Sequence, residues 1–157
     1  MIDPKQKELI DRYRSEIPVR VGALAVDLGL DVRLSSLSPK ISGLIEPSDD
    51  EGFLIRVNKF ESEERQRFTV AHEIAHFLLH RNLIKNGIVD SIMYRSALSS
   101  KHEVEANRLA ADILMPYDAV EAGLRELGNV RDEATATALA RKFRVSLPAM
   151  KVRLRME

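Results

Sequence analysis

The stretch FTVAHEIAHFLLH, residues 68–80, places His72, Glu73 and His76 in the order H-E-x-x-H. Apolar residues surround these three with the spacing of an α-helix. Residues four apart lie on one face of a helix, about one turn from each other, so both imidazoles can point at one metal ion. The Glu73 carboxylate would leave the helix beside that ion. Zinc hydrolases require such a set: fixed ligands, an open coordination position for water and a carboxylate base.

The alternative interpretation makes His72 and His76 ordinary buried imidazoles, hydrogen-bonded within the core. A chance H-E-x-x-H seldom falls in the middle of an apolar helical stretch such as this one. The pattern therefore favours a metal site.

The composition is that of a globular protein, because 45% of the 157 residues are hydrophobic and 31% are charged. The length suits one domain with its own core. No apolar run approaches the roughly 20 residues that cross a membrane, and the charged N-terminus does not resemble a signal peptide. The absence of cysteine excludes disulfides and thiolate ligands, so a metal must use histidine and carboxylate. We expect a cytoplasmic protein without a membrane partner.

Before the motif, the sequence predicts two helices followed by a small sheet. Pro4 and Gly29 suit the start and the end of these helices. The strand-like segments are short, rich in Leu, Ile and Val, and separated by turn residues. We expect helices at 3–15 and 18–29, and a three-stranded antiparallel sheet made of 30–36, 41–46 and 52–58.

The rest of the chain is predicted to be mainly helical. The motif helix should span 62–80, and residues 81–99 read as a loop that could cover the site. Four more helices are expected at 100–115, 118–127, 132–143 and 147–156. The sequence thus predicts an α+β fold with the H-E-x-x-H helix at its centre. Residues 1–157 should form a single domain, with the C-terminal helix pair 132–156 packed on it.

Two histidines leave a zinc site one protein ligand short. A metzincin would continue with glycine and histidine where this chain has Leu79 and Asn82, so that class is excluded. The remaining common solution takes a glutamate from a following helix. The helix predicted at 100–115 offers Glu103 and Glu105.

Only one of these glutamates can face the motif helix, because they lie about 200° apart around their own helix. We favour Glu103, since the small residues Ala106 and Ala110 would let its face approach closely. Asn107, four residues after Glu103, could then orient His72 or His76 by a hydrogen bond, as metal-bound imidazoles require. Otherwise both glutamates are solvated carboxylates that stabilise a helix N-terminus.

Other polar residues near the motif have less certain roles. His80 is expected to be a surface or capping histidine. A hydrolase also needs a hydrogen-bond donor for the developing oxyanion. Tyr94, Arg95, His102 and Tyr117 are all candidates, and spacing does not choose among them.

Several segments together resemble the ImmA/IrrE metallopeptidases. They are RQRFTVAHEIAHFLLH at 65–80, EVEANRLAADILMP at 103–116, the preceding GLI and IRVN segments, and the closing LARKFRVSLPAMKVRL. The resemblance covers the chain from about Pro18 to Leu154, and two motifs in the right order are more specific than the histidine pair alone.

The resemblance implies a gluzincin-like, zincin-type domain with a small sheet packed on it. It implies His72, His76 and Glu103 as zinc ligands and Glu73 as general base. The sequence leaves manganese open as an alternative to zinc. It also implies a substrate: such enzymes cleave helix-turn-helix repressors of the XRE type and so relieve repression. We further expect the strand GFLIRVN, 52–58, to bind substrate as an added extended strand.

The second hypothesis is a non-catalytic regulator that binds DNA or a repressor protein. The segment ALARKFRVSLPAMKVRL, 138–154, resembles a helix-turn-helix. Residues 131–157 hold seven Lys and Arg against three Asp and Glu, and these cations could meet phosphates. The candidates are Arg141, Lys142, Arg144, Lys151 and Arg153.

Overall fold

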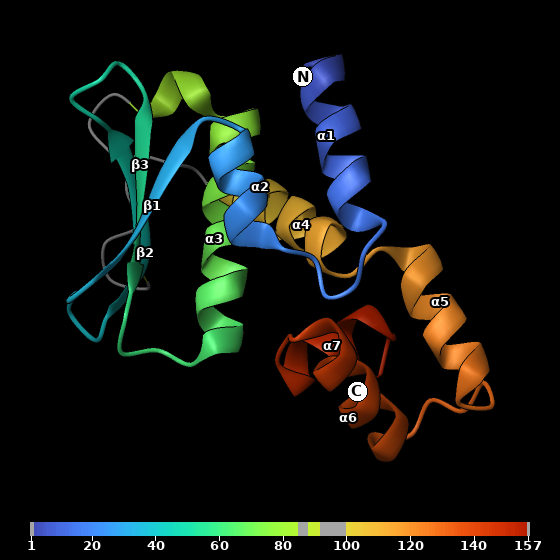
Figure 1. Cartoon of the computed structure of the whole chain (residues 1–157). Helices are drawn as coiled ribbons and strands as arrows, with labels where there is room; N and C mark the ends of the chain where they lie inside the picture. Colours follow the sequence, from blue (N-terminus) through green and yellow to red (C-terminus); the bar gives the residue numbers. More distant parts are fainter. Residues whose placement is uncertain (1, 85–87, 92–99, 157) are drawn as a thin grey trace.

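A computed structural model describes residues 2–84, 88–91 and 100–156. A sheet lies on one side of the molecule and helices fill the rest (Figure 1). The motif helix α3 (Glu63–Leu79) packs against the sheet and also against α2 (Val21–Asp27) and α4 (Ser100–Leu114). The predicted α+β fold with a central motif helix is confirmed.

The other helices fall where the sequence predicts them. α1 (Pro4–Arg14) begins after Asp3, whose carboxylate accepts a hydrogen bond from the backbone N–H of Lys5 at 2.7 Å. The remaining helices are α5 (Tyr117–Glu126), α6 (Glu133–Phe143) and α7 (Leu147–Arg153). Among the helices that the structure describes, none is both long and apolar enough to span a membrane.

The sheet differs from the prediction in strand number and direction. Its strands are β1 (Leu30–Ser35), β2 (Ile41–Pro47), β3 (Phe53–Asn58) and β4 (Ile88–Ser91), in the order β1-β3-β2-β4. β2 is antiparallel to both its neighbours, but β1 runs parallel to β3. The expected three-stranded antiparallel sheet is therefore a four-stranded mixed sheet.

Asn58, at the end of β3, is hydrogen-bonded to the connection between β1 and β2. Its side chain is 1% exposed and donates hydrogen bonds to the carbonyls of Ser38 at 3.1 Å and Ile41 at 2.9 Å. These bonds fasten the connection between β1 and β2 to the end of β3, which lies between the two strands in the sheet. Short strand patterns do not reveal such a distant contact.

The predicted loop at 81–99 contains regular structure. A 3-10 helix, η1 (Arg81–Leu83), follows α3, and β4 adds to the edge of the sheet beside β2. The prediction of an irregular loop is therefore wrong for 81–83 and 88–91. The proposed cover over the site falls partly on 85–87 and 92–99, which lie outside the described residues.

α3 is covered on all sides from Thr69 to Leu78. Every residue from Thr69 to Leu78 is buried, including both motif histidines and the glutamate. The helix begins at Ser62, whose hydroxyl accepts a hydrogen bond from the backbone N–H of Arg65 at 3.3 Å. A helix that is buried all round belongs to the interior, so its polar side chains must find partners there.

The C-terminal helices share the hydrophobic core. Phe143 of α6 and Met150 of α7 belong to the same buried cluster as Ile74 of α3. Arg153 donates to the carbonyl of Met115 at 2.8 Å, at the end of α4. That residues 1–157 form one domain stays a prediction.

Gly43 provides a test of the contact between the sheet and α3. A Cβ at this position would lie 2.4 Å from Cγ2 of Thr69 and 2.8 Å from the backbone oxygen of Arg56. We expect Gly43→Ala to lower the free energy of unfolding by about 1–3 kcal/mol, as overpacking does. Urea denaturation measures the change.

Gly22→Ala in α2 is the matched control, because nothing lies within 4 Å of the added Cβ. It should leave stability unchanged or raise it by up to about 1 kcal/mol. Equal stabilities for the two variants would refute the close approach of β2 to α3.

Candidate metal centre

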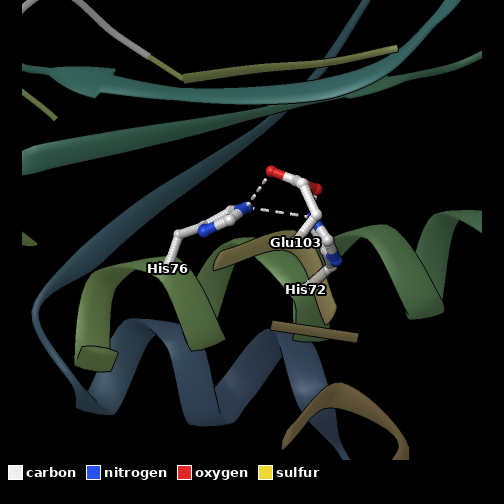
Figure 2. A group of neighbouring side chains, drawn as sticks. All are labelled: His72, His76 and Glu103. Carbon is white, nitrogen blue, oxygen red and sulfur yellow. Dashed lines mark hydrogen bonds and ion pairs between the residues drawn. The ribbon is translucent and has the colours of Figure 1, made fainter. Parts of the chain in front are cut away.

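His72 and His76 lie one turn apart on α3 and direct their rings toward the same point (Figure 2). Their Nε2 atoms are 3.0 Å apart and the rings are nearly perpendicular, at 89°. The two residues are 7% and 0% exposed. The spacing of the motif thus brings two imidazole nitrogens together in the interior, as predicted.

Glu103 of α4 completes the group from the opposite side. Its two carboxylate oxygens lie 3.2 Å from Nε2 of His72 and 3.3 Å from Nε2 of His76. The side chain is 18% exposed, so this side of the group is the most open to solvent. Of the two glutamates that the sequence offered, Glu103 is the one beside the motif histidines.

The spacing of these three groups fits a metal ion. Tetrahedral zinc has bonds of about 2.0–2.1 Å to nitrogen and oxygen, which places neighbouring ligand atoms roughly 3.3 Å apart. The observed separations of 3.0–3.3 Å match this value. Two imidazoles and one carboxylate also match a common donor set of catalytic zinc. His72, His76 and Glu103 could therefore hold a divalent cation.

Glu73 is fully buried on the same helix. One of its carboxylate oxygens lies 3.8 Å from the position that a Cβ on Gly43 would occupy. The main chain of β2 therefore passes directly over this carboxylate. The sequence did not predict this close approach of Gly43 to Glu73, since no local pattern connects the glycine to the motif.

His80 differs from the expectation in one respect. It ends α3, as expected of a capping residue, but it is 6% exposed rather than on the surface. Its Nδ1 lies 3.0 Å from Nδ1 of His76, and its Nε2 lies 3.1 Å from a carboxylate oxygen of Glu105. The histidines at 72, 76 and 80 share a four-residue spacing that could have signalled this contact.

The charge states of His80 and Glu105 follow from their surroundings. Burial lowers the pKa of His80, and the hydrogen bond with Glu105 acts in the opposite direction. The same hydrogen bond lowers the pKa of Glu105. At neutral pH the pair is therefore a neutral imidazole that donates to a carboxylate.

The structure gives no support to Asn107 as the residue that orients His72 or His76. Asn107 is exposed, whereas Ala106 and Ala110 on the same helix are fully buried. Those two alanines mark the line along which α4 contacts its neighbours. Asn107 lies at the margin of that line and faces solvent.

The candidate oxyanion donors separate into three groups. Tyr94 and Arg95 lie outside the described residues. The ring of His102 packs against that of His80, with centroids 4.7 Å apart. Tyr117 is 51% exposed, and the guanidinium of Arg153 lies over its ring at 3.6 Å. An oxyanion role for any of them stays a prediction.

The strand expected to bind substrate is not available for that purpose. β3 pairs with β1 on one side and with β2 on the other. Its backbone hydrogen-bonding groups are therefore already used, and an added strand has no place beside it. The expectation for GFLIRVN is wrong.

Most of the basic C-terminal residues face acidic side chains. Lys142 lies 3.6 Å from Glu126, and the side chain of Arg153, 6% exposed, lies 2.9 Å from Asp112. Two further ion pairs join Arg144 to Glu63 and Lys151 to Glu133. Four of the five candidate cations therefore have an acidic neighbour within the protein.

A model of the IrrE N-terminal-like domain, peptidase family M78, matches residues 25–155. The chain belongs to this family. The predicted resemblance is confirmed, and membership supports a metallopeptidase-like or regulatory role. A search of curated proteins finds no match.

A solved structure shares the fold of this IrrE-like chain. It is described as a Mycobacterium tuberculosis transcriptional regulator and is 16% identical, with a TM-score of 0.64. The alignment covers 99% of this chain and 48% of the regulator. The chain thus spans about half the length of that protein, and the likeness concerns the fold alone.

Removal of the Glu103 carboxylate tests the metal centre. Loss of a residue that only orients a metal ligand lowers metal affinity by roughly 10–100-fold. We expect Glu103→Gln to lower zinc affinity by more than this, because a ligand itself is lost. Competition with a chromogenic chelator measures the affinity. Glu121→Gln, an exposed change of equal charge on α5, should bind zinc like the wild type. Equal affinities for the two variants would exclude Glu103 as a ligand.

Proposed function

We propose that this chain is a metal-dependent endopeptidase that cleaves a helix-turn-helix repressor of the XRE type. The observation that carries the proposal is the group formed by His72, His76 and Glu103, with Glu73 directly beside it in sequence. Membership of a peptidase family supports the same reaction class. A repressor as substrate would place the enzyme in the cytoplasm and give it a role in transcription.

His72, His76 and Glu103 would hold the ion, with zinc favoured by the donor set and manganese as the alternative. When bound, such an ion supplies Lewis acidity and lowers the pKa of water toward about 7. Burial would keep the two histidine ligands in place before the ion arrives, because the interior that surrounds the middle of α3 restricts their rotamers.

Glu73 would act as general base and then as general acid. Its carboxylate accepts a proton from water while the water oxygen bonds to the scissile carbonyl carbon. The carbon–nitrogen bond then breaks, and Glu73 returns the proton to the leaving amine nitrogen. Its complete burial strengthens its electrostatic interactions by excluding bulk solvent.

An extended substrate would bind along β4. Among the described strands, β1 and β4 form the edges of the sheet. β4 pairs with β2, and β2 passes over Glu73 at Gly43. An edge strand offers unpaired backbone groups to a peptide, so β4 is the edge closer in the sheet to the candidate base.

DNA binding by the C-terminal helices receives no specific support from the structure. Arg153 is buried, and Lys142, Arg144 and Lys151 each form an ion pair. A helix pair that contacts phosphates needs its cations free for them. The proposed function therefore gives DNA no role.

Glu73→Gln tests the mechanism. The variant should bind zinc with unchanged stoichiometry. Its rate of cleavage of the XRE-type repressor encoded beside the gene should fall at least about 100-fold, because the proton acceptor is absent. Metal analysis and gel electrophoresis of the repressor give the two readings. Glu64→Gln, in the exposed first turn of the same helix, is the matched control and should cleave normally. Cleavage by Glu73→Gln at the wild-type rate would refute the proposed base, and intact repressor with metal-loaded wild type would refute the substrate.

A further inference from the structure

We propose that His80 and Glu105 are positioning residues that fix the orientation and the tautomer of His76. The inference rests on the metal centre of the proposed function and extends it beyond its ligands. It assigns a role to two residues that the ligand set does not include.

The three side chains form a continuous hydrogen-bonded chain. Nδ1 of His76 meets Nδ1 of His80 at 3.0 Å, and Nε2 of His80 meets Oε1 of Glu105 at 3.1 Å. His76 is fully buried and the side chain of His80 is 4% exposed, while that of Glu105 is 43% exposed. The chain therefore leads from the interior to the surface of α4.

The positions of the protons follow from the first metal centre. Nε2 of His76 faces Nε2 of His72 and Glu103, so a metal ligand there needs its lone pair. In a neutral imidazole the other nitrogen carries the hydrogen, so Nδ1 of His76 donates to Nδ1 of His80. His80 must then carry its own hydrogen on Nε2, where it donates to Glu105. Each partner fixes the tautomer of the preceding ring.

A second metal site is the competing interpretation. His80, His102 and Glu105 bring ligand atoms within 4.8 Å of one another. A cation on Nε2 of His80 would require the hydrogen of that ring to be on Nδ1, where it faces His76. With both ions bound, two N–H groups would meet at 3.0 Å. The geometry therefore favours an outer part of the first centre over an independent site.

Two variants of His80 test whether a hydrogen-bond acceptor is needed at the position of its Nδ1. Asparagine places its Oδ1 the same number of bonds from Cα as Nδ1 and can accept the hydrogen of His76. Phenylalanine retains a ring of similar shape but has no acceptor. We expect His80→Phe to weaken zinc affinity by about 10–100-fold and His80→Asn to remain within a few-fold of the wild type.

Chelator competition gives these affinities, and thermal unfolding of the metal-free proteins controls for stability. Equal affinity for wild type and His80→Phe would overturn the proposal. Equal losses in His80→Phe and His80→Asn, with metal-free stability unchanged, would also overturn it, because the acceptor would then be irrelevant.

Nitrogen-15 NMR of the wild-type histidines provides a test that needs no variant. In the zinc-loaded protein we expect the hydrogen of His76 on Nδ1 and that of His80 on Nε2. The opposite tautomer of His80 would refute the proposed hydrogen bonds from His76 to His80 and from His80 to Glu105. Two zinc ions per wild-type chain, reduced to one by His102→Gln, would establish the second metal site instead. Zinc-loaded wild type that cleaves no repressor would count against the proposed function alone.

Discussion

The middle of α3 is buried on all sides and carries four polar residues, Thr69, His72, Glu73 and His76. Buried polar groups must be paired to offset the loss of water. α4 meets this requirement by bringing Glu103 within 3.3 Å of both ring nitrogens. On the side of the sheet, β2 crosses α3 at Gly43, and the missing side chain leaves room for the Glu73 carboxylate. The polar residues inside α3 are thus accommodated by α4 on one side and by the sheet on the other.

Short-range patterns predicted much of this arrangement. The four-residue spacing of His72 and His76, the caps at Asp3 and Ser62, and the small residues of α4 all act within a few residues, so helix positions and the facing of Glu103 could be inferred. The parallel pairing of β1 could not be inferred, because it involves contacts between segments distant in sequence. Asn58, for example, binds a connection about twenty residues away. The spacing of His80 from His76 indicates that the two rings can meet, but the burial of His80 depends on how α4 covers the end of α3.

The C-terminal helix pair shows how one sequence pattern can serve two purposes. A basic helix–turn–helix sequence is typical of DNA-binding modules, yet here Arg153 donates to the carbonyl of Met115 and packs over Tyr117. Exposed ion pairs contribute little to stability individually. The apolar residues of α6 and α7 in the shared core, rather than the charges, explain why these helices are held where they are.

At Gly43 the wall that faces Glu73 is main chain instead of side chain. Peptide groups present the same donors and acceptors whatever the surrounding sequence. On this side the surroundings of Glu73 are therefore insensitive to side-chain substitution except at Gly43 itself, where any Cβ would meet Thr69 and the backbone of Arg56. In the proposed peptidase, differences in substrate preference would have to arise from other parts of the site.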